Sequence, residues 1–495
     1  MPIKLHSSYN PQKEAERFCN TINGMPKIII ITEPGESYLA EVLRKKFPET
    51  KLIAIRYTDT YFLLSDKFWD AVWRPAQGNL DFFLLRNIPD ELLCVSLFLS
   101  WKPAETVWPE TFKSVWTGIA SSIKIMQSVI ATRDFFGRRW LKNITDNFLF
   151  AENPVHFEFL TKDSLFTASG GSLKTVLKNN RNTLNKKFIV ASSSSISALS
   201  AYGITPDLCI ATDGGFWAAG HIKNISADIP IAFPPEAKIP YNVLKKNPCV
   251  FLTYGSLIEY FFFSNFNIPF KKAKRNGTVS GTAAELLLDY TRGTIYISGL
   301  DLEGTKGFSH VQPHESLKSK EAYFSKLYPI SQFAAVSNFD TRSLEVYANW
   351  FSQLEPEKSK RIRRIGFEGK NIESIKRISF EKFNDSSETY TQKKIIRHCV
   401  KKNKSERKDI IYDFYKTIEK NLKTGIFLDK LMDGLKREKE KYAENELCEL
   451  ISFQSYIKLI KENAFENTVY AKTELQNKVT QFVKGQLKRL KDERS

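Results

Sequence analysis

The sequence predicts an α/β protein with a Rossmann-like central domain built on a parallel sheet. Two observations support this prediction. Between residues 164 and 299, short apolar runs alternate with segments of helical spacing, as in βαβ units. Each run ends at a polar or glycine-bearing turn, and open parallel sheets bind ligands outside the carboxyl ends of their strands. We therefore expect three regions: an N-terminal α/β domain (1–153), the Rossmann-like domain (154–355) and a basic helical C-terminal region (356–495).

The N-terminal region begins with a strand, a turn and a helix of its own. The sequence predicts a buried strand over Lys27–Thr32, a helix over Tyr38–Phe47 and a second strand over Lys51–Tyr57. The first turn contains Glu33 and Glu36, whose charges oppose an anionic ligand at a helix N-terminus. We therefore predict a structural domain here rather than a second nucleotide site. Five tryptophans crowd this region, either as core or as a face for a partner: Trp69, Trp73, Trp101, Trp108 and Trp116.

The central domain opens on a strand, a glycine turn and a helix start. The apolar run Ser164–Ala168 is followed by Ser169, Gly170, Gly171 and Ser172, and helical spacing begins directly after them. Adjacent glycines let the backbone approach a ligand closely, and a helix N-terminus offers free N–H groups to a phosphate. The alternative is a plain connecting turn, which joins many strands to helices without a ligand.

Further apolar runs continue this pattern. Strands are expected over Lys187–Ala191, Leu208–Thr212, Ile231–Phe233, Cys249–Thr253 and Thr294–Gly299, and a helix over Ser280–Tyr290. Polar side chains stand at the carboxyl ends of the strands: Ser169, Ser192, Asp213, Ser298 and Asp301. One crevice could collect them, because the carboxyl ends of parallel strands meet at one edge of a sheet. The bulky cluster Tyr260–Phe263 is expected to pack in the core or, alternatively, to cover the crevice as an acceptor-binding lid.

Several segments of this region resemble a known family. Gly170–Leu173, Tyr202–Asp207 with Asp213, Ile297–Leu302 and Ser309–His310 look like the core of the motility-associated factor (Maf) glycosyltransferases. The same segments are similar to the core of archaeal hydroxymethylpterin pyrophosphokinases. The likeness covers roughly residues 160–350. It implies a Rossmann-like catalytic domain.

A more distant resemblance is to bacterial sialyltransferases that use CMP-sialic acid. Arg275–Gly281 resembles their arginine-containing helix start, and Ser309–His314 resembles their Ser-His-x-x-x-His segment. Ser169, Ser192 and Asp213 stand where that family carries asparagine. The nucleotide contacts could therefore differ from those of the sialyltransferases.

The resemblance implies a role for each candidate residue. The sialyltransferase pattern assigns the general base to His314 and the Maf pattern assigns it to His310; imidazole suits this role because it titrates near neutral pH. Arg275 would bind a phosphate or the carboxylate of the sugar. The implied nucleotide-binding residues are Ser169, Gly170, Gly171, Ser172, Ser192, Asp213, Ser280, Gly281, Ser298, Gly299 and Asp301. Asp213 would repel a phosphate, or else hold a divalent cation, Mg²⁺ or Mn²⁺, that bridges to it.

These roles predict a glycosyltransferase. The expected reaction moves a nonulosonic acid, such as a pseudaminic, legionaminic or sialic acid-like sugar, from its CMP ester to Ser or Thr of flagellin, in support of flagellar assembly and motility. Donor and acceptor both follow from the resemblance. One alternative keeps the fold and is a pyrophosphokinase that acts on a hydroxymethylpterin with ATP and Mg²⁺. Another is a non-catalytic scaffold, because Ser169 and Ser192 replace the asparagines of the sialyltransferases.

The composition limits the partners. The net charge is +18, and basic runs occupy 358–364, 393–408 and 484–494 in a region of helical spacing. Since these runs are not interleaved with aromatic residues, we expect a solvated basic face or a dock for an acidic protein rather than a nucleic-acid site. No run of eighteen apolar residues occurs and the first ten residues lack an apolar stretch, so we expect no membrane span and a cytoplasmic protein. Six scattered cysteines predict reduced thiols rather than a zinc site.

Overall fold

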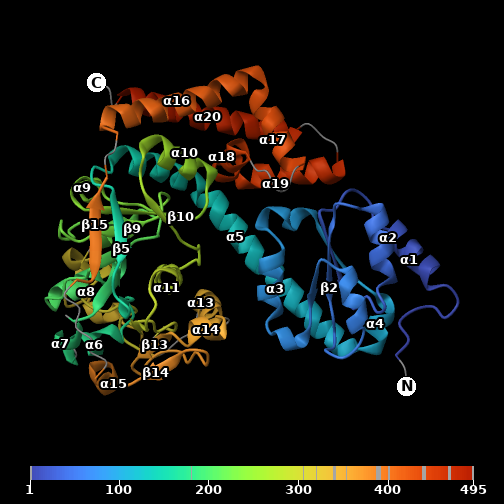
Figure 1. The fold of residues 1–495 in the computed structure, drawn as a ribbon, viewed down its shortest axis with the longest axis horizontal. Coiled ribbons are helices and arrows are strands. Elements are labelled where there is room, and N and C mark those ends of the chain that lie inside the picture. Colours follow the sequence, from blue (N-terminus) through green and yellow to red (C-terminus); the bar gives the residue numbers. More distant parts are fainter. Residues whose placement is uncertain are drawn as a thin grey trace. The chain divides into compact units, whose positions relative to one another are not determined.

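The chain forms two compact units in the computed structural model, which describes residues 3–492 apart from 180, 185, 305, 319, 338–341, 353, 386–391, 400–401, 437–441 and 467–469. Unit 1 contains Met1–Arg138 and Thr417–Ser495, and unit 2 contains Arg139–Lys416. Two helices cross these boundaries along the sequence: α5 (Pro109–Phe150) and α16 (Lys404–Thr424) (Figure 1). The C-terminal helices therefore group with the N-terminal sheet rather than with the central one.

Unit 1 contains a four-stranded parallel sheet in the order β3-β2-β1-β4. Its strands are β1 (Ile28–Thr32), β2 (Lys51–Ile55), β3 (Ala71–Trp73) and β4 (Ser96–Ser100). Its N-terminal helices are α1 (Pro11–Asn20), α2 (Tyr38–Lys46), α3 (Leu80–Asn87), α4 (Lys102–Val107) and the first part of α5, with 3₁₀ turns η1 (Leu63–Phe68), η2 (Pro75–Gln77) and η3 (Asp90–Val95). β1 is buried along its whole length, as expected of a run of isoleucines in the centre of a parallel sheet. The α/β start predicted for this region is confirmed.

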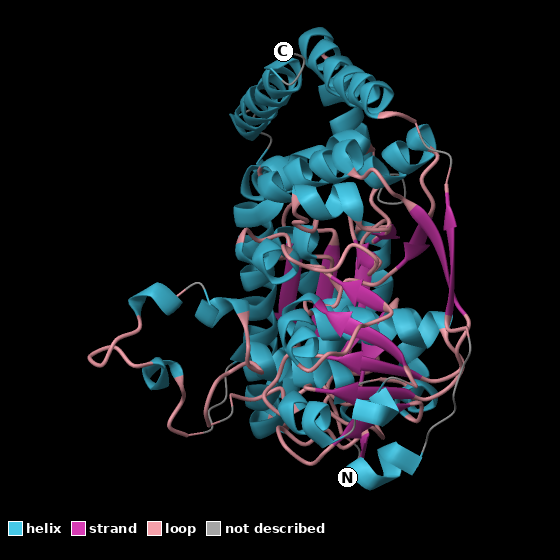
Figure 2. Cartoon of the chain, turned by 90° about the vertical axis from the view of Figure 1, so that its left-hand side faces the viewer, coloured by secondary structure: helices cyan, strands magenta, loops and turns pink. Residues whose placement is uncertain are grey.

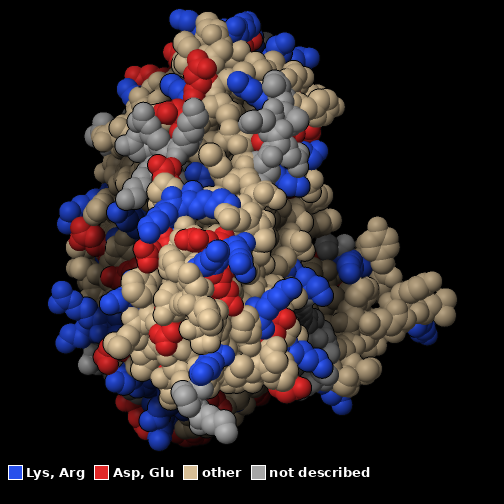
Figure 3. All heavy atoms as spheres, turned by 90° about the vertical axis from the view of Figure 1, so that its right-hand side faces the viewer, with Lys and Arg blue, Asp and Glu red and all other residues tan. Residues whose placement is uncertain are grey.

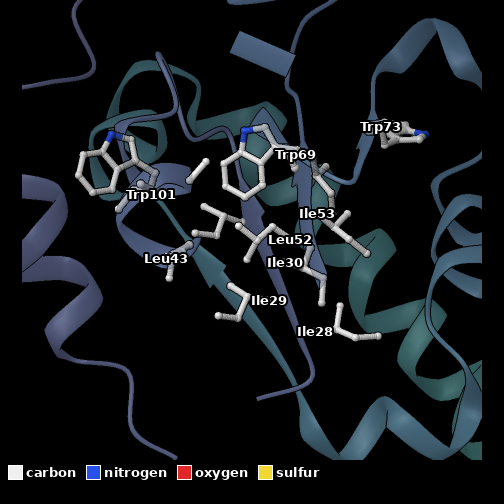
Figure 4. Packing of buried hydrophobic residues seen from close by; sticks show 14 of the residues in the cluster. Ile28, Ile29, Ile30, Leu43, Leu52, Ile53, Trp69, Trp73 and Trp101 are labelled. Atoms are coloured by element: carbon white, nitrogen blue, oxygen red, sulfur yellow. The ribbon is translucent and has the colours of Figure 1, made fainter. Parts of the chain in front are cut away.

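The tryptophans of unit 1 belong to its core. Trp69, Trp73 and Trp101 are buried in one cluster with the isoleucines of β1 (Figure 4). Trp108 and Trp116 are partly buried against the same cluster. The large apolar area of these rings thus stabilises the unit rather than forming a face for a partner.

An internal ion-pair network fills the carboxyl end of this sheet. Arg56, which follows β2, donates from Nη1 to Oε1 of Glu33, which follows β1, at 3.0 Å. Arg56 Nε also donates to Asp66 Oδ1 at 2.9 Å, and the backbone N–H of Tyr57 donates to Glu33 Oε2 at 2.8 Å. The Arg56 and Glu33 side chains are 0% and 1% exposed. Side chains of the protein therefore occupy the position at which a parallel sheet would bind a ligand.

The C-terminal part of unit 1 is helical, as predicted. It comprises the end of α16, α17 (Ile426–Lys436), α18 (Ala443–Ile451), α19 (Phe453–Lys461), a π-helical turn η8 (Glu462–Glu466) and α20 (Tyr470–Asp492). Leu475, Val479 and Leu490 are buried, so the helical spacing marks the packed side of α20.

Within the described ranges, no helix combines the length and the apolar character that a membrane crossing requires. On the face shown in Figure 3, lysines and arginines lie among aspartates and glutamates. The six cysteines, all within the described residues, form no disulfide, and four of them are buried.

Unit 2 is built on a nine-stranded sheet in the order β11-β10-β9-β8-β7-β6-β12-β13-β14, and every pair in it is parallel. The strands are β6 (Ser164–Thr167), β7 (Phe188–Ser192), β8 (Leu208–Ile210), β9 (Ile231–Phe233), β10 (Cys249–Thr253), β11 (Phe270–Lys272), β12 (Ile295–Ser298), β13 (Ile362–Ile365) and β14 (Lys376–Ile378). β5 (Val155–Phe159) and β15 (Lys394–His398) form a separate antiparallel pair. Figure 2 shows the strands with helices around them. The predicted α/β fold with a parallel sheet is confirmed.

Short helices connect these strands. They are α6 (Leu173–Asn179), α7 (Arg181–Leu184), α8 (Ile196–Ala201), α9 (Tyr241–Lys246), α10 (Leu257–Phe266), α11 (Val279–Tyr290), α12 (Glu315–Lys318), α13 (Arg342–Ser352), α14 (Pro356–Ser359) and α15 (Phe380–Asp385). The 3₁₀ turns are η4 (Ser193–Ser195), η5 (Trp217–Ile222), η6 (Glu321–Tyr323) and η7 (Ile330–Phe333). The helix predicted over Ser280–Tyr290 corresponds to α11.

The strand order reverses beside β6. The chain runs from β6 to β11 on one side and then crosses to β12, β13 and β14 on the other. The carboxyl ends of β6 and β12 thus form a topological switch point, where open α/β sheets bind ligands. β13 and β14 follow residue 355, in a stretch whose composition indicated a basic helical region.

The aromatic cluster Tyr260–Phe263 lies in α10. Phe262 and Phe263 are buried, with ring centroids 5.3 and 4.9 Å from that of Phe148 in α5. The Phe261 ring lies 5.0 Å from that of Phe414 in α16. These rings pack in the core of unit 2, which was the first of the two interpretations.

Candidate functional site at the switch point

The predicted glycine turn lies at the switch point. The backbone N–H of Ala168 donates to Ser298 O at 2.9 Å, and that of Gly170 donates to Gly299 O at 2.8 Å. A Cβ at Gly170 would lie 2.5 Å from Gly299 O and 2.5 Å from Asp301 Oδ2, so a side chain does not fit between the two strand ends. Close backbone contact therefore joins the segments that follow β6 and β12.

Asp301 receives the hydrogen-bond donors of this turn. Its buried carboxylate accepts a bond from the backbone N–H of Ser172 at 3.0 Å and another from Ser172 Oγ. The Asp301 carbonyl accepts a bond from the backbone N–H of Lys370 at 2.8 Å. The donors of Ser172 that the sequence assigned to a phosphate thus bind a carboxylate of the chain. A phosphate at this turn would have to displace that carboxylate.

The strand-end serines differ in their bonding. Ser298 Oγ is fully buried and has no hydrogen-bond partner among the described residues. Ser192 Oγ lies 3.2 Å from Ser194 Oγ, and Ser195 Oγ lies 3.1 Å from Thr167 Oγ1. Because an unsatisfied buried hydroxyl costs about 1–3 kcal/mol, Ser298 is the serine that would gain most from a ligand.

His310 lies against the same turn. Its Nδ1 is 3.2 Å from Ser169 Oγ, and the backbone N–H of the next residue, Val311, donates to Ser169 O at 2.8 Å. Burial and then the nearby His221 lower the pKa of His310 below its usual value, while the bond to Ser169 and the charge of Asp301 act in the opposite direction. The imidazole is therefore neutral at pH 7.

Two more histidines adjoin His310. The His314 ring stacks on the His310 ring with centroids 4.4 Å apart, and the His221 ring lies 4.9 Å from the His314 ring. His314 Nδ1 accepts a bond from the backbone N–H of Ser316 at 3.3 Å, which places the proton of the neutral ring on Nε2. That buried Nε2 has no partner in the part of the chain that the structure describes. Burial first, and then the two neighbouring imidazoles, lower the pKa of His314 to about 3.

His221 was not among the candidate residues predicted from the sequence. It lies in η5, in the connection after β8, and its Nδ1 is buried without a partner among the described residues. Burial lowers its pKa, and the charges of Glu315 and Asp213 oppose that effect. No motif surrounds His221. Only the order of the strands brings it beside the loop that follows β12.

The histidine cluster predicts a loss of stability in acid. His314 is 2% exposed, and its pKa falls from 6.5 to about 3 on folding, so the unfolded chain binds more protons between these values. Stability is then fully present above pH 6.5 and decreases as the pH falls, by about 3 kcal/mol at pH 4. Denaturant unfolding at several pH values measures this slope. The His314→Asn variant should show a flatter slope, and an unchanged slope would contradict the assignment.

Arg275 pairs with a carboxylate rather than standing free for an anion. Its Nη2 donates to Glu236 Oε2 at 2.5 Å, and its guanidinium carbon lies 5.2 and 5.0 Å from the ring centroids of Trp140 and Tyr254. Asp213 is exposed, and its Oδ1 accepts a bond at 2.7 Å from the backbone N–H two residues further along. An anionic ligand of Arg275 would therefore compete with Glu236.

Ser280 and Gly281 lie in the first turn of α11. Thr278 caps this helix, since its Oγ1 accepts a bond from the Gly281 N–H at 2.9 Å. A Cβ at Gly281 would lie 2.7 Å from Asn276 Cβ. Local packing therefore explains why glycine occupies position 281, and no ligand is needed to explain it.

The chain is similar to a described protein family over part of its length and to a known bacterial protein. A family model described as "6-hydroxymethylpterin diphosphokinase MptE-like" matches residues 138–307. A Treponema pallidum (strain Nichols) protein described as "Uncharacterized protein" is 40% identical over 306 residues, which is 62% of this chain and 68% of the relative. The chain belongs to the same family as this relative.

A solved structure shares the fold. The structure of a Maf glycosyltransferase from Magnetospirillum magneticum AMB-1 matches with a TM-score of 0.51, covering 97% of this chain and 87% of that one at 10% sequence identity. At this identity the match shows the fold alone. Together with the family model, it confirms the resemblance to Maf and MptE-like proteins that the motifs indicated.

Proposed function

We propose that the protein is a glycosyltransferase that moves a nonulosonic acid from its CMP ester to a Ser or Thr hydroxyl of flagellin. One observation carries the proposal: His310, neutral at pH 7, lies at the switch point against the segment that follows β6. The fold shared with a Maf glycosyltransferase supports it. The cytidine donor and the flagellin acceptor derive from the resemblance of the motifs.

The transfer requires one base and one leaving group. The acceptor hydroxyl loses its proton, its oxygen bonds to the anomeric carbon, and the bond from that carbon to the phosphate oxygen breaks, so that CMP leaves with the electron pair. His310 Nε2 would take the proton, because Nδ1 is directed at Ser169 Oγ and Nε2 has no partner among the described residues. His314 would position this ring by stacking against it.

The remaining candidates would hold the donor. Ser298 Oγ would gain a hydrogen bond from the ribose or the base. Arg275 would exchange part of its interaction with Glu236 for the phosphate or the sugar carboxylate, and its planar fork suits either anion. Ser280 and Gly281, in the first turn of α11, would lie at the nucleotide end. Asp301 would act indirectly, by fixing the turn that begins at Ser169.

The family model favours a second candidate, a pyrophosphokinase that transfers a diphosphate from ATP to a hydroxymethylpterin. Asp213 and Asp301 would then be ligands of Mg²⁺. The Asp301 carboxylate binds Ser172 in the structure, and no group of three or more His, Cys, Asp or Glu side chains among the described residues is arranged to hold a metal ion. Sugar transfer therefore remains the first choice.

Calorimetric titration with CMP and, separately, with ATP plus Mg²⁺ tests this choice. We expect the full chain to bind CMP more tightly, and Ser298→Ala to weaken CMP binding about tenfold by removing one hydrogen bond. Ser164→Ala is the matched control: its Oγ is also buried without a partner among the described residues, but at the amino end of β6. A preference for ATP with Mg²⁺ would replace sugar transfer by the kinase reaction.

A further inference from the structure

Two exposed aromatic rings lie in the connection after β8 that also carries His221. Trp217 begins η5 and is 80% exposed, and its ring centroid lies 5.5 Å from that of the exposed Phe216. The same turn of helix carries His221, which contacts His314. Exposed tryptophan is uncommon outside sites that bind something, because its large ring is stabilised by burial.

A second apolar segment begins just after His314. We define residues 321–337 as the apolar arm. Among the described residues, its backbone hydrogen bonds are local, except at its base, where Gly307 and Ala335 exchange bonds of 2.8 and 2.7 Å. The chain enters the arm through α12, whose Leu317 N–H donates to His314 O at 3.0 Å. The exposed apolar side chains of the arm are Tyr323, Leu327, Tyr328, Ile330, Phe333 and Val336.

The arm is almost uncharged. It contains Glu321 and Lys326, which have opposite signs, within a chain whose net charge is +18. Leu327 is 83% exposed. A surface of this chemistry suits an apolar protein partner and offers no net positive charge to nucleic acid or to an anionic membrane.

Trp217 and the apolar arm each belong to a connection that carries histidines of the cluster, and these connections contact each other through the His221 and His314 rings. η5 contributes Trp217 and His221, while the loop after β12 contributes His310, His314 and then the arm. The two connections that carry these apolar side chains therefore also carry the three histidines of the candidate site. Ser172 follows β6 and Ser298 ends β12, so these nucleotide candidates belong to other segments than Phe216, Trp217 and the apolar arm.

We infer that Phe216, Trp217 and the apolar arm form a docking surface for the protein acceptor, a segment with exposed aliphatic or aromatic side chains next to the modified Ser or Thr. The inference rests on the proposed sugar transfer. The inference states which kind of side chain on the acceptor is bound. It also assigns acceptor binding and donor binding to different residues of the chain. Exposed tryptophan and tyrosine are the side chains that most often dominate such interfaces.

The test compares two reactions of the full-length protein. The first is release of CMP from a CMP-nonulosonic acid without acceptor, and the second is transfer to purified flagellin, followed by intact-mass spectrometry. Trp217→Ser, and Leu327→Ser combined with Tyr328→Ser, should raise the KM for flagellin at least about tenfold and leave CMP release and kcat unchanged. Leu160→Ser is the control, since Leu160 is an exposed residue in the connection that enters β6 at its amino end.

Each other outcome is informative. Equal KM values for the variants and the control would overturn the docking surface while leaving sugar transfer intact. A wild-type protein that neither releases CMP nor modifies flagellin would refute the transferase, and the docking inference with it. Loss of a dimer by the variants in analytical ultracentrifugation would assign the surface to a second copy of the chain. Loss of binding to phosphatidylcholine vesicles would assign it to a membrane. Either of these last results would overturn the inference.

Discussion

Replacing His310 with alanine is expected to lower sugar transfer about 10²- to 10⁴-fold, the usual contribution of a general base. Nδ1 of this ring is held by Ser169 Oγ at 3.2 Å, and its neutral form leaves Nε2 able to accept a proton. Since the pKa of His310 is lowered, activity should rise with pH through a pKa below 6.5 and then stay level. Steady-state transfer measured from pH 5 to 8 shows both effects.

The matched control is His156→Ala. His156 is an exposed histidine of β5 that bonds to Glu158 at 3.1 Å, so its loss should leave transfer unchanged. Loss of transfer in His314→Ala with normal transfer in His310→Ala would reverse the two roles and favour the sialyltransferase pattern. Undiminished glycosylation with both His310→Ala and Asp301→Ala would favour a scaffold without activity.

Most strands of the unit 2 sheet could be predicted from the sequence alone. The runs Ile231–Phe233 and Cys249–Thr253 correspond residue for residue to β9 and β10, because a strand buried on both faces leaves a continuous apolar signal with sharp ends. The glycine and serine turns marked where several of these strands end. Polar residues directly after the strands therefore indicate the edge of the sheet at which a ligand is expected to bind.

Other elements left a weaker signal. The sequence Ile362-Arg363-Arg364-Ile365 forms β13, yet its charges indicated a basic run. Arg364 is buried there, and its guanidinium donates to the carbonyls of Lys370 and Glu368 at 2.5 Å each. A charged side chain is compatible with a strand only when such acceptors are available, and these acceptors come from the loop that follows.

The motifs predicted several residues that lie together at the switch point, but not the partners that these residues bind. The motifs identified Asp301 and Ser172, and the structure adds that they bind each other. Arg275 was expected to meet an anion of the ligand, whereas Glu236 now holds it. Glu236 and His221 carry no motif of their own. Their positions depend on long-range strand order, which short patterns do not encode.

Removing Arg56 is expected to destabilise unit 1 by about 3–5 kcal/mol, the cost of leaving a buried charge without its partner. In Arg56→Ala, the Glu33 carboxylate, 1% exposed, keeps the N–H of Tyr57 but loses its only cationic partner within the described ion pairs. Asp66 retains Arg74, whose Nε donates to it at 2.8 Å. Urea unfolding followed by tryptophan fluorescence reports this change, because Trp69, Trp73 and Trp101 lie in the core of the same unit.

Arg44→Ala provides the comparison within the same sheet domain. Arg44 pairs with Asp70 at 3.0 Å, but both side chains are 40% exposed, so its loss should cost at most about 1 kcal/mol. Replacing Arg56 and Glu33 together by methionine should recover much of the stability lost in Arg56→Ala, since no buried charge then remains between the two strand ends. Equal costs for Arg56→Ala and Arg44→Ala would show that the buried pair is solvated in solution. The carboxyl end of the unit 1 sheet would then be open to a ligand, whereas a large difference would support the structural role that the sequence predicts for this domain.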